Sequence, residues 1–543
     1  MKRLASLLFL APAAAFAQMA PDAGQLLQQL GPPPVLSAPK SSPTRIEEKR
    51  PDSPADEARI AVKAFLISGA HAIPVAELQA LIADSSGKEF TLADIDVLAL
   101  RITRYYREAG YLVARAYVPA QEINNGVLEI AVLEGVLGKV EIENRAGIGG
   151  AALATINALQ TGAALRSSTL ESSLLALSDL PGVEVRTTLR PGETIGASDL
   201  LVEVQPGRVL TGSIDLDNFG NRFTGAYRLG GNFSWNNPAG LGDQISVRAQ
   251  GSDEEMTYLR LGYQLPVGPW GTRLGVAWSE MRYLLGKDFA VLNADGRATT
   301  ASLYAQHPLL RRRDANLFVA LQYDGKSLLD RIGATNTHAR KSLDSWTVSL
   351  QGAMADDIAG GGISSALLSW TTGRLEMDRD SAIIDQASAR SKGHFDRWNF
   401  ALNRTQRLTD RWSLFLSWTA QGARKNLSSS EKFSLGGAQS IRAYPQGEGT
   451  GDEGRLLSAE FRWQLSDTWQ ALAFYDDGRV KINHSPWTPE TNHRHLAGTG
   501  LGINYANNGF TVKIFTAWKA GTGKPTSDID RSPRLWAQAI KVF

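Results

Sequence analysis

The stretch Trp412-Ser-Leu-Phe-Leu-Ser-Trp418 alternates apolar with mostly polar residues and carries a tryptophan at each end. The same alternation recurs in Trp346-Thr-Val-Ser-Leu-Gln351 and in Leu457-Ser-Ala-Glu-Phe-Arg-Trp-Gln-Leu465. Because successive residues of a β-strand point to opposite faces, each stretch presents one apolar and one polar face. The apolar face suits lipid, the polar face suits a wet lumen, and tryptophan suits the membrane boundary. The pattern therefore predicts a transmembrane β-barrel.

Alternating segments continue from residue 208 to residue 543. Some connections are tight, such as 408–410 and 465–467, whereas 373–395 and 422–455 are long and polar. At about 20 residues per strand and connection, this region holds roughly sixteen strands. We therefore expect an all-β barrel of about 16 antiparallel strands. Short turns are expected on the periplasmic side and long loops outside the cell.

The first seventeen residues have the organisation of a signal peptide. Lys2 and Arg3 precede an apolar run that ends at Phe16, and Ala15-Phe-Ala17 is a small-x-small cleavage pattern. We expect residues 1–17 to be removed on export, because the run is too short for the alternative, a membrane anchor. The sequence contains no cysteine, which excludes disulfides and thiolate metal sites. Its net charge of +2 gives no electrostatic argument for binding nucleic acid.

Residues 18–57 are interpreted as a plug helix and a linker. Asp22 to Leu30 can form a short helix, which Gly31-Pro-Pro-Pro34 ends. Proline, serine and charged residues predominate from 31 to 56, which predicts an extended segment without a core. A disordered tail is the alternative to a plug, because so short a helix is marginal on its own.

Residues 58–135 and 136–207 share the order strand, helix, helix, strand, strand, which predicts tandem copies of one small α+β domain. In the first copy, Thr91 is expected to cap a helix that Gly110 ends. The residues expected on one face of this helix are Ile95, Leu98, Ile102 and Tyr105.

Each copy is expected to close with two strands. A hairpin of 113–118 with 127–133 follows the first helix, turned at Asn125-Gly126. In the second copy, Ser168 and Glu171 predict a capping box. Its strands are expected at 184–190 and 200–204.

Glycine placement from Phe433 to Gly454 is too ordered for a featureless loop. The segment resembles the sixth-loop motif of two-partner secretion transporters, the TpsB or hemolysin secretion/activation family of the outer-membrane insertase superfamily. The residues that carry this resemblance are Ile441, Arg442, Ala443, Tyr444, Gly447, Gly451, Asp452 and Gly454. Ala443 departs from the glycine common at its position in the wider superfamily.

Two further stretches resemble the same family. One looks like its first polypeptide-transport-associated (POTRA) domain and contains Tyr106, Arg107, Gly110, Tyr111, Pro119 and Gln121. The other, with Phe474, Asp476 and Gly478, is similar to the motif on the barrel wall that faces loop six. The resemblance implies a plug helix, two POTRA domains and a sixteen-stranded barrel.

The resemblance also implies roles for particular residues. Arg442 would reach back into the lumen and pair with Asp476 as a guanidinium–carboxylate lock. The pair would serve either transport or barrel stability alone, and the sequence leaves both open. Phe543 matches the C-terminal aromatic residue that the barrel-assembly machinery recognises, although Lys541 occupies a position that is often apolar. A lysine near a strand end can snorkel to the membrane surface.

Other patterns have plainer interpretations. The glycines from 449 to 454 satisfy G-x-G-x-x-G, but no strand-turn-helix unit surrounds them, so we expect no dinucleotide or other cofactor. His493 and His495 are more typical of solvated side chains than of a metal site. Arg311-Arg-Arg313 is interpreted as a basic cluster at the membrane edge that touches lipid phosphate.

The resemblance implies a transporter for one large β-rich exoprotein with an N-terminal secretion domain. The POTRA sheets would capture an extended segment of it by strand addition, and the chain would cross the barrel unfolded. Further expected partners are the barrel-assembly machinery, periplasmic chaperones and outer-membrane lipid, but no nucleic acid. The alternatives are a barrel insertase, which usually has three or more POTRA domains, a diffusion porin, and an exported enzyme, for which no catalytic set stands out.

Overall fold

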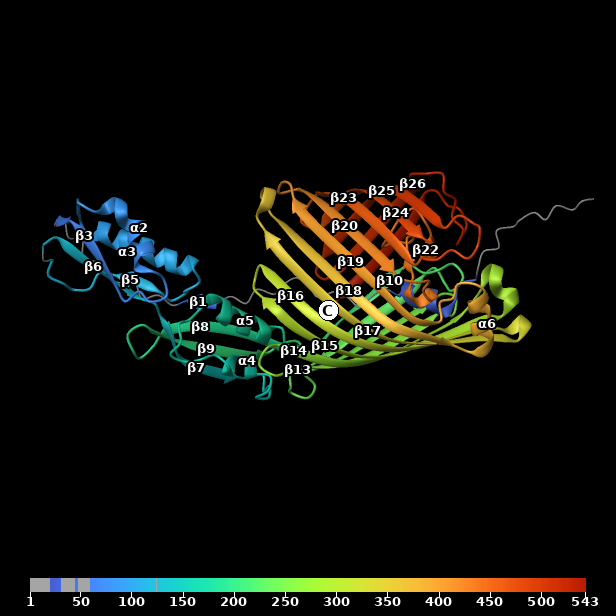
Figure 1. Ribbon diagram of the computed structural model, residues 1–543, viewed down its shortest axis with the longest axis horizontal. Helices are drawn as coiled ribbons and strands as arrows, with labels where there is room; N and C mark the ends of the chain where they lie inside the picture. The colour runs from blue at the N-terminus through green and yellow to red at the C-terminus, as the bar shows by residue number, and fades with distance from the viewer. Residues whose placement is uncertain (1–19, 31–43, 47–58, 124) are drawn as a thin grey trace, which may run out of the picture.

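The computed structural model describes residues 20–30, 44–46, 59–123 and 125–543. It consists of a barrel with two α+β units at one of its ends (Figure 1). The expected signal peptide and most of the expected linker lie outside the described residues. Within the described ranges, no helix is both long and apolar enough to cross a membrane.

Sixteen antiparallel strands form the closed barrel, which confirms the expected architecture. Each strand pairs with the next, and the first pairs with the last to close the ring. In barrel order they are β10 (Leu210–Asp217), β11 (Arg228–Asn236), β12 (Gln244–Ser252), β13 (Thr257–Val267), β14 (Thr272–Leu284), β15 (Ala294–Arg311), β16 (Ala315–Ile332), β17 (Thr337–Asp356), β18 (Gly362–Met377), β19 (Gly393–Arg407), β20 (Trp412–Ala423), β23 (Glu453–Gln464), β24 (Trp469–Lys481), β25 (His493–Asn507), β26 (Phe510–Lys519) and β27 (Arg534–Val542).

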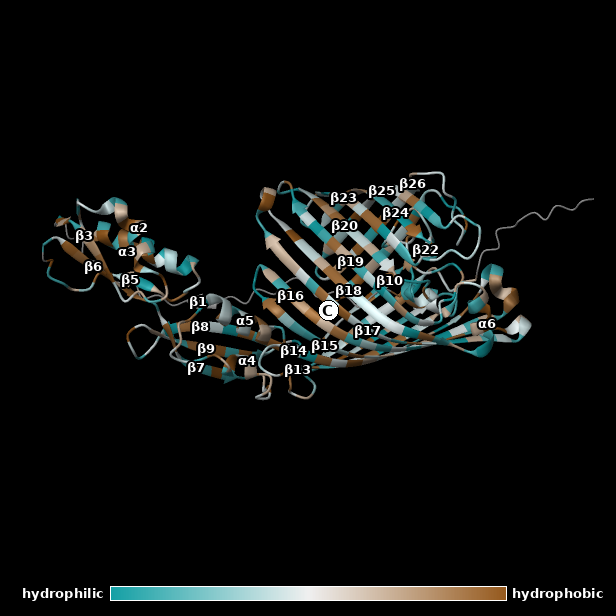
Figure 2. Ribbon diagram, in the orientation of Figure 1, coloured by the Kyte–Doolittle hydropathy of each residue, from teal (hydrophilic) through white to brown (hydrophobic). Residues whose placement is uncertain are grey.

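The alternation along the strands separates a lipid face from a lumen face. In β23, Leu457 and Phe461 are exposed on the outside, whereas Glu460 between them is buried. Figure 2 shows the result as apolar and polar bands that alternate along the barrel strands. The tryptophans Trp346 and Trp418 also lie on the outer face, about half exposed. The period of two therefore assigns each side chain to lipid or to lumen, as predicted.

The strands are longer than the sequence pattern indicated on the side of the long loops. β18 continues to Met377 and β19 begins at Gly393, so the predicted connection 373–395 retains only one helix, α6 (Arg379–Ala387), and its flanks. The polar residues at these strand ends pair regularly, as in Arg374 opposite His394, because backbone pairing does not require apolar side chains. Shorter 3-10 helices occupy other connections: η2 (Lys287–Leu292), η3 (Gly333–Thr335) and η4 (Ile358–Gly360).

The first α+β unit packs two helices against a three-stranded sheet ordered β3-β6-β5. A small β2-β4 pair lies beside it and was not expected. The elements are β2 (Ile60–Val62), β3 (Ala64–Ser68), α2 (Val75–Ile82), η1 (Ala83–Ser85), β4 (Lys88–Phe90), α3 (Leu92–Glu108), β5 (Arg115–Tyr117) and β6 (Val127–Leu133). Asn125 and Gly126, at the predicted turn, both have positive φ.

Helix α3 begins as predicted, at a capping box of Thr91 with Asp94. Its buried face contains Ile95 and Ile102, but it continues to Tyr106 and not to the predicted Tyr105. Tyr106 is four residues after Ile102, so a helical period of 3.6 keeps it in line, whereas Tyr105 lies at the edge of the core. Tyr105 therefore packs only partly against the core, and Tyr106 takes the fully buried position.

The second α+β unit contains β7 (Val136–Asn144), α4 (Ala154–Asn157), α5 (Ser167–Ser178), β8 (Val183–Pro191) and β9 (Ala197–Pro206). A segment of the expected linker, β1 (Thr44–Ile46), adds to its sheet in parallel with β8, giving the order β1-β8-β9-β7. The capping box predicted at Ser168 is absent, because α5 already begins at Ser167, whose N–H donates to the Gly110 carbonyl at 2.7 Å.

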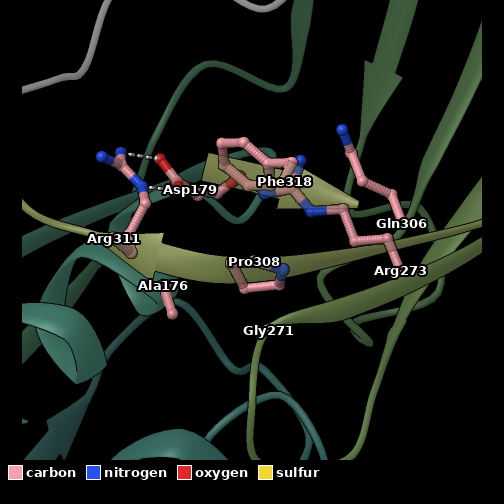
Figure 3. Close-up of a pocket in the computed structure, with 8 residues that line it drawn as sticks. All are labelled: Ala176, Asp179, Gly271, Arg273, Gln306, Pro308, Arg311 and Phe318. Atoms are coloured by element: carbon pink, nitrogen blue, oxygen red, sulfur yellow. Dashed lines mark hydrogen bonds and ion pairs between the residues drawn. The ribbon is translucent and has the colours of Figure 1, made fainter. Parts of the chain in front are cut away.

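The second unit is bound to the barrel turns by ion pairs. Both Nε and Nη2 of Arg311 donate to the Asp179 carboxylate, at 2.8 and 2.9 Å (Figure 3). Arg273 donates to the Asp179 carbonyl at 2.7 Å, and Arg313 contacts Glu171 at 3.1 Å. The sequence-based assignment of the 311–313 cluster to lipid was therefore wrong for Arg311 and Arg313, whose partners come from a domain that is distant in sequence.

Candidate functional site

Loop six, residues 424–452, folds back into the barrel instead of extending into solvent. It contains η5 (Ser429–Glu431) and a hairpin of β21 (Phe433–Ser434) with β22 (Thr450–Gly451). Beyond the hairpin, Ile441 and Tyr444 are almost wholly buried, packed with wall residues such as Phe474 and Phe515. An extracellular loop with a buried apolar tip obstructs the lumen.

Arg442 at this tip binds the barrel wall through every polar group of its side chain. Its Nε and Nη2 donate to the two Asp476 oxygens at 3.0 and 2.8 Å, and its Nη1 donates to Glu460 at 2.6 Å. Nη2 also donates to the Ser458 hydroxyl at 3.1 Å. Arg442 is 5 % exposed and Asp476 is fully buried. The structure thus brings together the two residues that the family resemblance paired.

Aromatic rings and small residues enclose this ion pair. The guanidinium carbon of Arg442 lies 3.5 Å from the centroid of the Phe474 ring, and the indole N–H of Trp536 donates to the Arg442 carbonyl at 2.7 Å. A cation over an aromatic face is attracted by the ring quadrupole, more strongly when desolvated. A Cβ added at Gly478 would lie 2.6 Å from a terminal methyl group of Leu435 and 2.9 Å from one of Ile441, so any larger residue here would displace the side chains of the loop tip.

The glycines of loop six serve two purposes. Gly447 has a φ of +80°, a left-handed conformation that favours glycine. Gly451 and Gly454 have ordinary φ, but an added Cβ would lie 2.3 Å from the Lys481 carbonyl oxygen and 2.4 Å from the Phe433 ring, respectively. Ala443 contacts Gly498, where an added Cβ would lie 2.6 Å from the Ala443 Cβ. The loop therefore follows a narrow path along the wall.

Two buried carboxylates hold the remainder of loop six. Glu448 accepts hydrogen bonds from Thr526 and Ser527, both from N–H and from hydroxyl, and pairs with Arg494. The Tyr444 hydroxyl donates to the Gly523 carbonyl at 3.0 Å on the same outer connection. These contacts tie the loop to the connection between β26 and β27.

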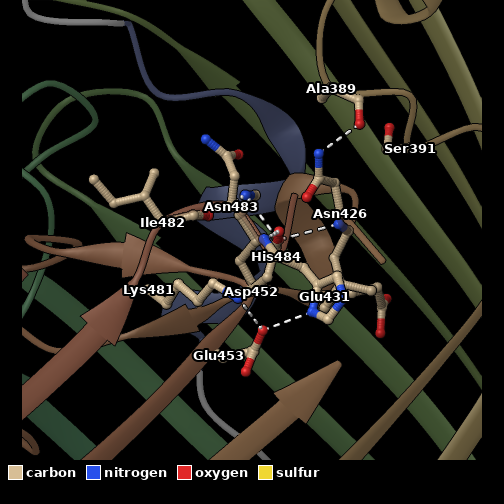
Figure 4. Close-up of polar contacts among 12 residues, drawn as sticks. Ala389, Ser391, Asn426, Glu431, Asp452, Glu453, Lys481, Ile482, Asn483 and His484 are labelled. Atoms are coloured by element: carbon tan, nitrogen blue, oxygen red, sulfur yellow. Dashed lines mark hydrogen bonds and ion pairs between the residues drawn. The ribbon is translucent and has the colours of Figure 1, made fainter. Parts of the chain in front are cut away.

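Asp452 is fully buried at the base of the loop. It accepts from the N–H groups of Leu427 and His484 at 3.0 and 2.7 Å and pairs with Lys432 at 2.8 Å. Beside it, Glu453 contacts both His484 and Lys481 (Figure 4). Three segments of the extracellular end converge on these two carboxylates.

Helix α1 (Ala23–Gln29) lies in the lumen beside loop six. Asp22 caps it and also accepts from the Ser429 hydroxyl at 2.7 Å and contacts Lys341 at 3.5 Å. The Ala23 N–H donates to the wall carboxylate Asp330 at 2.8 Å. A Cβ at Gly24 would lie 2.4 Å from the Ser429 hydroxyl, so the helix and the loop are in close contact.

Half of the residues that resemble a POTRA motif lie at the joint between the two α+β units. The Tyr106 and Tyr111 rings pack edge to face, and Arg166 of the second unit donates to the Tyr111 hydroxyl at 3.1 Å. Gly110, with a φ of +93°, ends α3 and presents its carbonyl to the second unit. The structure therefore groups three of the six predicted residues.

The other three lie apart. Gln121 accepts from and donates to the Glu129 backbone, at 2.8 Å each, and so continues the pairing of β6. Pro119 is on the same connection, and Arg107 is exposed on α3. These positions maintain the sheet edge and the helix surface rather than the joint.

Sequence reasoning did not select Glu460, Ser458 or Glu448 as site residues. Glu460 and Ser458 stand on the lumen side of the alternating stretch from 457 to 465, so the same period that identified the strand contained the signal. Glu448 lies within the loop-six segment, yet its partners are Arg494 in β25 and Thr526 and Ser527 in the connection after β26, and no local pattern links them.

The remaining predicted positions lie near the rim and the seam. His495 contacts Asp477 at 2.6 Å, and no group of three or more potential metal ligands occurs among the residues that the structure describes. Phe543 exchanges two backbone hydrogen bonds with Gly212, at 3.0 and 3.1 Å, where the barrel closes. Lys541 donates to the Asn508 carbonyl at 2.8 Å, with its ammonium at the turn.

Comparison with known families gave two matches. The model described as haemolysin secretion/activation protein ShlB/FhaC/HecB matches residues 196–505, more than half of the chain. The model described as POTRA domain, ShlB-type, matches residues 60–135.

Curated proteins and solved structures were also similar. The heme/hemopexin transporter protein HuxB of Haemophilus influenzae strain 86-028NP is 27% identical, covering 86% of this chain and 84% of its own. The outer membrane transporter CdiB of Dickeya dadantii is 24% identical, covering 79% of this chain and 77% of its own. The structure of CdiB from Escherichia coli has a TM-score of 0.70 at 21% identity, covering 91% of this chain and 93% of that one. BamA from Haemophilus ducreyi has a TM-score of 0.56 at 14% identity, covering 89% and 100%.

We predict that Arg442→Ala destabilises the barrel by about 3–5 kcal/mol, because it leaves the buried Asp476 without its cation. It also leaves Glu460 with Arg462 as its one remaining cation. Adding Asp476→Ala should restore part of this loss, so that the two effects are not additive. The measurement is urea unfolding of the folded band in heat-modifiability gels. The control is Arg374→Ala, which removes an exposed pair with Glu376 and should cost less than about 1 kcal/mol. Equal losses for both variants would contradict a buried lock.

We predict that the first α+β unit becomes less stable at acid pH, because Glu134 becomes protonated. Burial by itself raises the pKa of Glu134. Hydrogen bonds from the N–H groups of Ala72 and His71 and from the Tyr106 hydroxyl lower it by more, so its pKa lies below the usual 4.5. Because the unfolded state then binds the proton more readily, stability is present above pH 4.5 and is lost as pH falls through the folded pKa.

The measurement is hydrogen exchange of peptides from 59–135 in the full-length protein, between pH 5.5 and 3. Glu134→Gln should lower the free energy of opening that protects these amides from exchange by about 1 kcal/mol at neutral pH. It should also make this protection less dependent on pH. Glu77→Gln, on an exposed contact with Tyr105, is the control and should keep the wild-type pH profile. An unchanged profile in Glu134→Gln would refute the assignment.

Proposed function

The chain belongs to the haemolysin secretion/activation protein family ShlB/FhaC/HecB, and from this membership we propose how it captures and moves its partner. It is an outer-membrane β-barrel transporter of a secreted exoprotein, with its POTRA region in the periplasm. The finer assignments are that residues 58–135 and 136–207 are two POTRA domains and that 208–543 form the barrel. The two separate hydrophobic cores of the α+β region support that division.

The captured partner is one large β-rich exoprotein that presents an extended N-terminal secretion segment. The single observation that carries this proposal is the β1 strand, which joins the sheet of the second unit along β8 with Thr44 opposite Thr187 and Ile46 opposite Leu189. An edge that accepts a linker segment by backbone pairing offers the same groups to a partner. Strand addition requires little side-chain specificity, which suits a long and variable cargo.

Transport then requires the lumen to open. The plug helix, held by Asp22, Ser429 and Lys341, and the loop-six lock at Arg442 both occupy the path. Besides these polar contacts, Ala23 and Leu26 of α1 are buried in an apolar cluster with wall residues such as Met281. α1 is nevertheless a single helix of seven residues, whereas the loop tip belongs to the long loop six. We assign α1 as the removable plug and the Arg442–Asp476 pair as the fixed support along which the unfolded chain passes.

Insertion into the membrane uses the barrel-assembly machinery after delivery by periplasmic chaperones. Phe543 is the proposed recognition residue, supported by its backbone bonds to Gly212 and by a ring contact of 5.9 Å with Phe233 at the seam. Outer-membrane lipid then surrounds the apolar outer face. The partner is proposed to resemble hemolysins, hemagglutinins or, in view of the HuxB relative, heme-scavenging proteins.

The likeness to BamA concerns the fold alone and leaves the insertase as the alternative function. Deletion of this gene should abolish secretion of the adjacent large exoprotein, while other outer-membrane barrels stay within about twofold of wild type. Immunoblots of the medium, periplasm and outer membrane measure both quantities. If many barrels fall together, the insertase function replaces the transporter.

The chain lacks cysteine, so single-cysteine variants report contacts cleanly. We predict that Thr188→Cys, on the β8 edge, forms a disulfide with a cysteine in the secretion segment of a stalled exoprotein. Glu141→Cys, on β7 at the opposite edge of the same sheet, is the matched control and should crosslink at least about tenfold less. Crosslinks of equal strength at both edges would contradict capture along β8.

A further inference from the structure

Arg455 and Arg479 stand directly opposite each other on β23 and β24. Both side chains are exposed. Residues paired in this way on antiparallel strands have Cβ atoms about 4.5–5.5 Å apart, and like charges placed so are destabilising. Two adjacent guanidinium groups therefore require an explanation.

The pair faces the membrane side of the barrel. Leu457 and Tyr475, two and four residues away on the same strand faces, are each 47 % exposed, whereas Ser458 and Asp476 point into the lumen. The pair lies at the strand ends next to loop six, at the end of the barrel remote from the α+β units. The apolar outward residues of β23 begin at Leu457, so the pair stands at the edge of this apolar band, where lipid headgroups would surround an outer-membrane barrel.

In the described part of the chain, neither guanidinium has a hydrogen bond or an ion pair. The nearby carboxylates already have other partners. Asp477 binds His495 at 2.6 Å, and Glu453 binds Lys481 at 3.1 Å as well as His484. The positive charge of the pair is therefore not neutralised within the described protein.

A second arginine pair on the outer face of the barrel is neutralised by a carboxylate. Arg282 and Arg297 stand directly opposite each other on β14 and β15. Both bind Glu280, which Arg282 approaches to 2.5 Å. The chain thus supplies a carboxylate for one exposed arginine pair and none for the other.

We propose that Arg455 and Arg479 bind the phosphate of a lipid headgroup in the outer leaflet, namely a phosphorylated glycolipid of the lipid A type. Two guanidinium groups present forked donors that match phosphate oxygens. Basic side chains at the membrane surface attract anionic headgroups, and Leu457 and Tyr475 below them contact the acyl chains. A free phosphate anion would share the charge chemistry but not these apolar contacts.

The arginine pair lies on the same two strands that hold the Arg442 lock. The inner faces of β23 and β24 carry Ser458, Glu460 and Asp476, the wall side of the Arg442 lock. A bound lipid would therefore brace the outer face of the two strands that hold the lock.

The test compares the full-length protein with the double variant Arg455→Ala/Arg479→Ala and the matched control Arg282→Ala/Arg297→Ala. The probes are lipid A, dephosphorylated lipid A and inorganic phosphate, and native mass spectrometry in detergent measures the bound fraction. Heat-modifiability confirms that each variant is folded. We expect the first double variant to bind lipid A at least about tenfold more weakly, with the control within about twofold of wild type.

Three results would overturn the proposal. Equal losses in both double variants would indicate a general effect of surface charge. Wild-type binding of dephosphorylated lipid A as tightly as of lipid A would exclude the phosphate contact. Binding of inorganic phosphate as tightly as lipid A would show an anion site without lipid.

Discussion

Inside a bilayer, each backbone N–H and C=O group must find its hydrogen-bond partner within the protein, because hydrocarbon offers none. This constraint governs the chain from residue 210 onward. Sixteen strands satisfy one another in sequence order, and five residue pairs between β10 and β27 close the ring. Once the ring is closed, the lipid face and the lumen face of every strand are fixed by alternation.

Closure also creates a wide polar interior that must be filled or left as an open pore. Here it is filled by loop six and α1, which come from distant parts of the chain. The lock shows how such an interior holds charge. Arg442 meets Asp476 and Glu460 in a confined space, and an aromatic ring covers its guanidinium. Because the pair is buried, removing either partner would leave the other charge buried and unpaired. Loop six and α1 thus occupy the interior through buried ion pairs together with apolar contacts, such as those of Tyr444 and Leu26.

The periplasmic units are positioned by the same kind of contact. Tyr111 with Arg166 joins one unit to the next, and Asp179 with Arg311 joins the second unit to the barrel. These joints hold the second unit, whose β8 edge pairs with β1, against the barrel turns and leave the cores of the two units separate. The α+β region and the barrel are therefore linked by a few polar contacts rather than by a continuous core.

The sequence by itself determined the barrel, the two α+β units and the positions of the lock, because a period of two, glycine placement and the family motifs are local signals. The strand face at 457–465 even contained Glu460, although its role was not recognised. Tertiary structure alone decided which charges meet. The basic run at 311–313 was assigned to lipid because its partners, Asp179 and Glu171, lie more than a hundred residues earlier, and the capping box at Ser168 failed because Gly110 of the other unit bonds the start of α5. Local periodicity fixes which face a side chain takes, whereas the partner of a charge depends on how distant segments fold together.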